Sequence, residues 1–105
     1  MIDIVIPNFN SENTILFTID SINQQSASGF TTIIVDDKST DQSVSLIKNN
    51  ISGNSNFRLI ELPENRGAAN ARNTGVEQSE ADIIVFIDSD VIIKPNTISS
   101  IAYFF

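Results

Sequence analysis

The 105-residue chain contains no cysteine, no histidine and no tryptophan, and few of its residues are basic. Without cysteine it can form neither a disulfide nor a thiolate zinc site. Without histidine it lacks the most common general base and transition-metal ligand, so any metal ion would be a hard cation held by oxygen atoms. Six lysines and arginines stand against thirteen aspartates and glutamates, a net charge of −7. This balance argues against nucleic-acid partners, which are bound by clustered basic residues.

Long hydrophobic runs are also missing. No apolar stretch approaches the roughly 20 residues that span a bilayer, and the first residues lack the basic and apolar regions of a signal peptide. Length and a hydrophobic content of 41% are ordinary for a soluble globular protein, so we expect one domain, 1–105. We expect a cytoplasmic location, with any attachment to the cytoplasmic membrane face residing in sequence absent here.

Short apolar runs alternate with segments of helical periodicity. Strands are predicted at Ile2–Ile6, Thr31–Val35, Phe57–Leu62 and Ile83–Ile87. Helices are predicted at Ser11–Gln25, Asp41–Asn50, Arg66–Ser79 and Asn96–Phe105, with Ser39 and Gln42 as a capping box before the second helix. The third strand alternates as an edge strand would, whereas the other three are typical of parallel strands covered on both faces. The alternation predicts an α/β protein: a three-layer α/β/α, Rossmann-like fold around a mainly parallel sheet.

Polar residues follow each predicted strand, at the edge where ligands of open parallel sheets bind. After the fourth strand come Asp88, Ser89 and Asp90. In an extended chain the two carboxylates would face one point, and charges so close require a cation or a proton. Mg²⁺ is typically held by one or two carboxylates plus substrate phosphates, so this pair is a candidate metal site. The alternative is a solvated turn in which one aspartate caps nearby backbone.

Two further groups are candidates for ligand binding. Asp36 and Asp37 follow the second strand, where a carboxylate can accept the N–H of a uracil-type base or a ribose hydroxyl; alternatively they cap the next helix. Arg66 and Arg72 fall in one short segment, and arginine forms forked hydrogen bonds to phosphate. The alternative for them is a surface helix with solvated arginines.

Together these segments resemble the family 2 glycosyltransferases, which share the GT-A fold. The matching blocks are Ile4-Val5-Ile6-Pro7-Asn8-Phe9-Asn10, Ile34-Val35-Asp36-Asp37-Lys38-Ser39-Thr40-Asp41, Pro63-Glu64-Asn65-Arg66-Gly67, Ala71-Arg72-Asn73-Thr74-Gly75 and Phe86-Ile87-Asp88-Ser89-Asp90. Several motifs in the order and spacing of the family identify it more specifically than a single motif would. The resemblance spans essentially the whole chain. Lys38 departs from the small residue that the family often has there.

The resemblance implies a site for a nucleotide-diphosphate sugar. By this likeness the nucleotide-sugar-binding residues are Pro7, Asn8, Asp36, Asp37, Arg66 and Asp88, and Asp88 and Asp90 hold Mn²⁺ or Mg²⁺. Asp37 would contact the base, usually uracil, so a UDP-sugar is expected, and Asp90 is the preferred direct metal ligand. The metal would act as a Lewis acid on the departing nucleoside diphosphate. The implied reaction is glycosyl transfer to a saccharide or lipid-linked acceptor, as in polysaccharide biosynthesis.

Length is the larger departure from the family. Its catalytic domains continue well past the DxD motif, here Asp88-Ser89-Asp90, and carry the acceptor site and the base of inverting members there. We therefore expect an N-terminal nucleotide-sugar-binding part truncated after this motif, with its catalytic base beyond Phe105 and little or no transfer activity alone. An unpaired sheet edge in such a domain would favour a homo-oligomer.

One alternative function stays open from the sequence, a non-catalytic nucleotide-binding or regulatory module. A dinucleotide-binding Rossmann domain is disfavoured, because Pro7-Asn8-Phe9-Asn10 stands where its Gly-x-Gly-x-x-Gly turn would follow the first strand.

Overall fold

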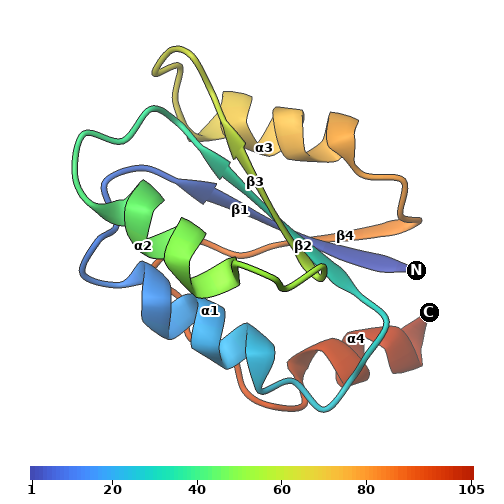
Figure 1. Ribbon diagram of the computed structural model, residues 1–105. Coiled ribbons are helices and arrows are strands. Elements are labelled where there is room, and N and C mark those ends of the chain that lie inside the picture. The colour runs from blue at the N-terminus through green and yellow to red at the C-terminus, as the bar shows by residue number, and fades with distance from the viewer.

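The computed structural model describes all 105 residues, and strands and helices alternate strictly along the chain (Figure 1). In chain order the elements are β1 (Ile2–Asn8), α1 (Ile15–Asn23), β2 (Thr31–Asp36), α2 (Ser43–Ile51), β3 (Phe57–Glu61), α3 (Ala68–Gln78), β4 (Ile83–Phe86) and α4 (Thr97–Phe104). Every predicted strand and helix is present, and the predicted α/β class is confirmed. No helix has the length and apolar character needed to cross a membrane.

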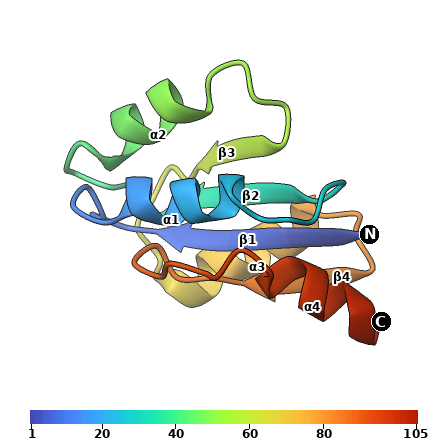
Figure 2. The same cartoon turned by 90° about the horizontal axis from the view of Figure 1, so that it is seen from below.

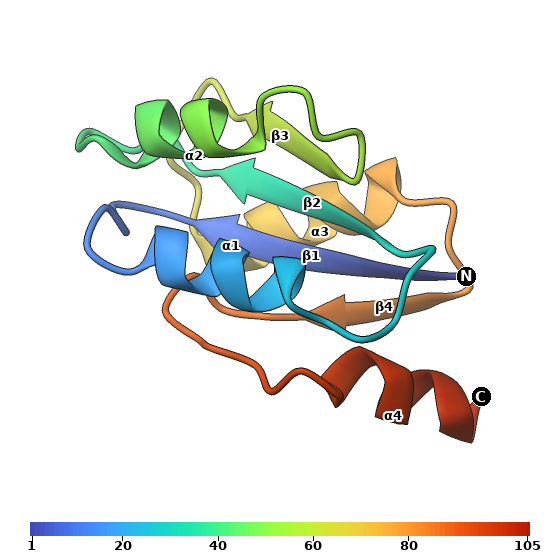
Figure 3. The same ribbon diagram turned by 60° about the horizontal axis from the view of Figure 1, so that its bottom comes forward.

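The sheet has four parallel strands in the order β3-β2-β1-β4. Strand β1 lies inside the sheet, and all of its residues are buried. The register pairs Asn8 at the end of β1 with Asp36 at the end of β2, so these two strands finish side by side. The carboxyl ends of the strands therefore meet at one edge, on the left in Figure 3.

Helices α1, α2 and α4 cover one face of the sheet, and α3 covers the other (Figures 2 and 3). Ile15, Ile19 and Ile22 lie three and four residues apart in α1, so they share one side of the helix and pack into the larger core with Ile4 and Ile6 of β1. Each fully buried isoleucine stabilises the fold by about 1.5–3 kcal/mol. This isoleucine packing holds α1 in place beside the strand ends.

Helix α3 approaches the sheet closely through Gly75. A Cβ atom on this glycine would lie 2.4 Å from Cγ1 of Val5, a separation that real side chains do not reach. Val5 and Ala71 belong to a smaller core on this face of the sheet. Gly67, which precedes the helix, has a φ of +96°, in the range that favours glycine. These two glycines bring the start of α3 against the edge where the strands end.

Strand β4 is an edge strand, so the prediction that Ile83–Ile87 is covered on both faces is wrong. None of the strand residues of β4 is fully buried, and Phe86 is 48% exposed. The physical reason is that α3 packs mainly on β1 and β2, so on that side of β4 Ile84 is only partly buried and Phe86 is exposed. The opposite edge is β3, as the alternating pattern of Phe57–Leu62 predicts.

The predicted capping box before the second helix is also wrong. Helix α2 begins at Ser43, and Gln42 before it makes no side-chain capping bond. The Ser39 hydroxyl donates instead to Oδ1 of Asp36 at 2.6 Å. Asp41 supplies the acceptor that the helix start needs, because the N–H of Ser43 donates to its Oδ1 at 2.9 Å. A nearby buried carboxylate thus competes successfully for the serine.

Candidate functional site

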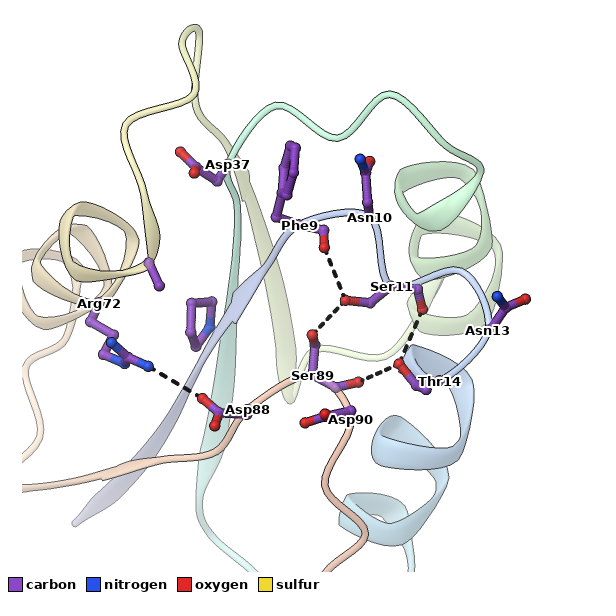
Figure 4. Close-up of a pocket in the computed structure, with 12 residues that line it drawn as sticks. Phe9, Asn10, Ser11, Asn13, Thr14, Asp37, Arg72, Asp88, Ser89 and Asp90 are labelled. Atoms are coloured by element: carbon purple, nitrogen blue, oxygen red, sulfur yellow. Dashed lines mark hydrogen bonds and ion pairs between the residues drawn. The ribbon is translucent and has the colours of Figure 1, made fainter.

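A polar cleft of about 510 Å³ opens where β1, β2 and β4 end (Figure 4). It is lined by Pro7, Phe9, Asn10, Ser11, Asn13, Thr14, Asp37, Ala68, Arg72, Asp88, Ser89 and Asp90. These residues come from the end of β1 and the loop after it, the first residue after β2, the first half of α3 and the turn after β4. Segments far apart in the chain meet here because parallel strands all end at the same edge.

Asp88, Ser89 and Asp90 form a tight turn. The N–H of Val91 donates to the carbonyl oxygen of Asp88 at 3.1 Å, which closes a β-turn. The prediction of an extended chain at this point is therefore wrong. Both carboxylates nevertheless line the same cleft, because the turn follows buried Ile87 directly and presents its polar residues at the strand end.

Arg72 brings a positive charge to the acidic turn. Its Nη2 atom lies 3.3 Å from Oδ1 of Asp88, and the two side chains are 38% and 63% exposed. A pair with this much solvent contributes about 0–1 kcal/mol and rearranges easily. Arg66, which the resemblance places at the nucleotide, does not line the cleft; its guanidinium binds Glu64 at 2.8 Å. The fold thus brings Arg72 into the cleft and leaves the Arg66 side chain outside it.

The protein offers no closed cage for a metal ion. No group of three or more acidic side chains is placed to hold one. Asp88 and Asp90 together match the way Mg²⁺ is bound, with one or two carboxylates and the remaining positions taken by water and substrate phosphate. Asp90 makes no ion pair, whereas Asp88 is partly neutralised by Arg72. The residues present therefore fit a cation shared with a bound phosphate. Asp90 is the freer of the two carboxylates, because Asp88 is paired with Arg72.

Asp36 and Asp37 point to different parts of the molecule. Asp37 is 3% exposed and lines the cleft, and its two oxygens accept the backbone N–H groups of Arg66 and Gly67, both at 2.8 Å. Asp36 is 2% exposed and does not line the cleft. It accepts the N–H of Ser39 at 2.9 Å and so holds the turn that follows β2. Asp37 is the one that reaches the cleft, because successive residues leave a strand on opposite sides.

Asn8 supports the cleft without lining it. Its buried amide donates to Oδ1 of Asp36 at 2.8 Å, and its own Oδ1 has no hydrogen-bond partner. The structure therefore divides the predicted binding residues into two groups: Pro7, Asp37 and Asp88 line the cleft, and Asn8, Asp36 and Arg66 do not.

The predicted binding residues include Pro7 and Asn8 at the end of β1 but none of the loop that follows, although several of its residues line the cleft. Phe9, 46% exposed, and Ser11 and Thr14 all line the cleft. The rule that ligands bind beyond strand ends points to this loop. Its residue types carry no distinctive chemistry, so the sequence offered no signal to single them out.

Side-chain hydrogen bonds hold the loop after β1 against the loop after β2. Asn10, whose φ is +50°, accepts the backbone N–H groups of Thr40 at 2.8 Å and Asp41 at 3.3 Å. Glu12 accepts the N–H of Gln42 at 3.0 Å. The first loop therefore has a defined shape even though it contains neither helix nor strand before α1 begins at Ile15.

Asp41 of the second loop adds a further hydrogen bond between the two loops. Its Oδ2 accepts the N–H of Glu12 at 3.1 Å, and its Oδ1 accepts both the N–H and the hydroxyl of Ser43. Desolvation by burial raises the pKa of Asp41, but the hydrogen bonds from Ser43 and Glu12 together outweigh it and hold the pKa below its usual value. The ionised carboxylate is thus the form that the two loops bind.

Comparison with known proteins places residues 3–105 on the family model described as Glycosyl transferase family 2. An uncharacterized glycosyltransferase of Haemophilus influenzae is 39% identical over 90 residues, covering 86% of this chain and 36% of that protein. The chain spans only 12% to 36% of the length of such curated relatives.

Two solved structures share the fold. TarS of S. aureus, solved in complex with UDP, has a TM-score of 0.91 and 29% identity, covering 98% of this chain and 31% of its own. A mannosyltransferase of Pyrobaculum calidifontis, solved with GDP-Man and Mn²⁺, has a TM-score of 0.79 and 27% identity, covering 85% of this chain and 27% of its own. The sheet and helices described above are thus those of GT-A structures.

Proposed function

The chain belongs to glycosyl transferase family 2, and from this premise we propose that the polar cleft binds the nucleoside diphosphate sugar that donates the sugar. One observation carries the proposal: the strand-end carboxylate Asp37, the arginine Arg72 and the acidic turn at Asp88 and Asp90 all line one cleft. Its volume of about 510 Å³ falls within the range of about 300–1,000 Å³ that is usual for ligand sites.

Uridine is proposed to bind between Phe9 and Asp37. The buried carboxylate of Asp37 uses two acceptor positions for backbone N–H groups, and a carboxylate has about four. It can therefore also accept the N–H of a uracil ring. The half-exposed ring of Phe9 in the same cleft offers a face on which a base can stack. The structure of TarS with UDP supports a uridine nucleotide.

The diphosphate is proposed to lie between Arg72 and the acidic turn, with Mn²⁺ or Mg²⁺ bound there. Arg72 is the only basic side chain that lines the cleft, against Asp37, Asp88 and Asp90. A diphosphate would meet net negative charge and be repelled unless a cation offset it. When bound, the metal would supply Lewis-acid stabilisation of the departing nucleoside diphosphate. Asp90 is the proposed direct ligand, and Arg72 can leave Asp88 to bind phosphate.

The proposed reaction is transfer of a glycosyl group from this donor to a saccharide or lipid-linked acceptor. No residue is assigned as the base that removes the acceptor proton. Asp37 is engaged with two backbone N–H groups, and Asp88 and Asp90 are assigned to the cation. The proposal therefore gives this chain the donor-binding part of the reaction, and we expect transfer by the 105 residues alone to be absent or very weak.

The first test is calorimetric titration of UDP with and without Mn²⁺, on the unaltered protein and on Asp90→Ala. We expect binding that requires the metal and that weakens at least about tenfold in the variant, since a lost charged ligand costs more than about 1.4 kcal/mol. Asp20→Asn is the matched control, because Asp20 is an exposed aspartate of α1 that does not line the cleft.

Two results would contradict the proposal. Equal UDP affinity with Mn²⁺ and with a chelator would show that no cation takes part in UDP binding. Binding of NAD without binding of UDP would show that the cleft takes a dinucleotide and not a uridine-linked sugar donor.

A further inference from the structure

Beyond Ile87, whose N–H still donates to the carbonyl oxygen of Val5 in β1, the backbone is held by side chains of α1 and of Thr14, the residue that caps it. The hydroxyl groups of Thr14 and Thr18 both donate to the carbonyl oxygen of Ser89, each at 3.1 Å. Further along, the N–H of Ile93 donates to the Ser21 hydroxyl at 3.2 Å. Thr14, Thr18 and Ser21 are four and three residues apart, so they lie on one side of α1. This side faces the segment that carries the acidic turn.

The two threonine hydroxyls bind the carbonyl oxygen at the centre of the turn. Ser89 and Asp90 are its two middle residues, and the peptide bond between them includes the carbonyl that Thr14 and Thr18 bind. Thr18 is fully buried, so its hydroxyl has no water to compete for that carbonyl. Figure 4 shows the Thr14 side chain directed at Ser89, between the first loop and the acidic turn.

A second contact holds the same residue from its side chain. The hydroxyls of Ser11 and Ser89 lie 2.5 Å apart, and the Ser11 hydroxyl lies 3.3 Å from the carbonyl oxygen of Phe9. Either hydroxyl can donate in the short contact between Ser11 and Ser89, and the Phe9 carbonyl can accept from Ser11. The backbone and the side chain of Ser89 are therefore both bound by the first loop and α1.

The orientation of this central peptide decides the type of turn. In a type I turn both middle residues have negative φ, whereas a type II turn, reached by flipping the central peptide, needs a positive φ at the second. Asp90 is not among the residues with positive φ. Two hydroxyl donors on the Ser89 carbonyl oppose the flip, because it would turn that oxygen away from α1.

We propose that Thr14 and Thr18 are positioning residues for the donor site: their hydroxyls hold the Ser89 carbonyl and so keep Asp88 and Asp90 in the orientation that binds the cation. Thr18 does not line the cleft, and Thr14 lines it beside the turn, but neither is assigned as a ligand of the metal or the nucleotide; both act through the turn. This inference rests on the proposed donor function, since it assigns a role within that same site. A turn held in the binding orientation raises apparent affinity, because affinity falls in proportion to the competent fraction of the protein.

The test compares Mn²⁺ affinity in the presence of saturating UDP, measured by electron paramagnetic resonance, in variants of α1. Thr18→Val keeps the shape of the side chain and removes the hydroxyl, and we expect a Mn²⁺ affinity about five- to tenfold lower, the effect of losing one hydrogen bond. Thr18→Ser keeps the hydroxyl and should restore the affinity. Ser21→Ala is the matched control, because Ser21 lies on the same side of α1 but binds Ile93, beyond the turn.

A purely structural role for Thr18 predicts a different result, in which Thr18→Val and Ser21→Ala lower the melting temperature and leave Mn²⁺ affinity equal. That result, or failure of Thr18→Ser to restore affinity, would overturn the inference. Should Thr18→Val not fold, Thr14→Val and Thr14→Ser provide the comparison at a half-buried position that lines the cleft, where the serine keeps the hydroxyl and should retain the affinity. If the unaltered protein binds neither UDP nor UDP with Mn²⁺, the donor site itself is refuted, and that outcome is distinguishable because it does not involve the variants.

Discussion

Neighbouring residues of the same type serve different parts of this molecule. Asp37 faces the cleft and also organises the entry to α3 through the N–H groups of Arg66 and Gly67. Asp36 faces Asn8 and Ser39 and shapes the turn after β2. Each carboxylate accepts hydrogen bonds from groups of the protein itself. The aspartate pair therefore supports the structure of the site before any ligand binds.

The aromatic side chain of Phe9 gives a prediction at the residue scale. Base stacking on an aromatic ring contributes about 1–3 kcal/mol, so Phe9→Ala should weaken binding of UDP with Mn²⁺ by roughly five- to 150-fold in calorimetry. Phe17→Ala is the control, because Phe17 is an exposed phenylalanine of α1 that does not line the cleft. Equal affinities in the two variants would mean that the base binds elsewhere.

At the scale of elements, the site depends on how closely α3 lies against β1. Arg72 reaches Asp88 from the helix, and Gly67, which precedes the helix, donates its N–H to Asp37. Both contacts require the close approach that Gly75 permits. A helix standing farther from the sheet would separate the arginine from the acidic turn.

Gly75→Ala tests this packing. Alanine favours a helix by about 1 kcal/mol over glycine, but its Cβ would lie 2.4 Å from Cγ1 of the fully buried Val5. Overpacking a tight core costs about 1–3 kcal/mol or more. We therefore expect a net loss of up to about 2 kcal/mol in the free energy of unfolding, measured in urea.

Val5→Ala supplies the companion measurement for this helix. It makes room for the new methyl group, so the double variant Val5→Ala/Gly75→Ala should be more stable than the sum of the single effects predicts. Asn73→Ala, at an exposed position of the same helix, is the control for helix propensity. Additive effects of the two changes would show that α3 and β1 do not meet through these residues.

At the scale of the whole molecule, the cleft joins the ends of three strands and the start of one helix. A ligand that contacts all of them stabilises the folded state by RT ln(1 + [L]/Kd), about 2.7 kcal/mol at a hundred times its Kd. For a domain of this size, each 1 kcal/mol raises the melting temperature by about 4–8 °C. UDP and Mn²⁺ together should therefore raise the melting temperature by roughly 10–20 °C.

Calorimetric scans with each component separately complete that prediction. UDP alone and Mn²⁺ alone should each produce a much smaller shift, because the diphosphate and the acidic turn repel one another without the cation. Asp90→Ala should lose most of the combined shift while melting near the unaltered protein in the absence of ligand. A full shift with UDP alone would contradict the shared cation.

The order of strands and helices and the class of the fold follow from the amino-acid sequence alone. Hydrophobic periodicity depends only on residues close in the chain, so the isoleucine stripe of α1 and the apolar run of β1 could be identified without coordinates. The motifs at Asp36-Asp37 and Asp88-Ser89-Asp90 also stood out, since residue types at strand ends are local information, and the family membership that they indicated is confirmed.

Which of these residues meet became known only from the folded arrangement of the chain. Arg72 and not Arg66 enters the cleft, and Asp37 and not Asp36 lines it. The coverage of β4 likewise depends on where α3 lies relative to β1 and β2.

The physical reason is that side-chain direction and helix placement result from packing between distant segments. The contact of Thr14 and Thr18 with Ser89 joins residues more than seventy positions apart. No local spacing of hydroxyl groups in α1 can indicate which carbonyl they will bind.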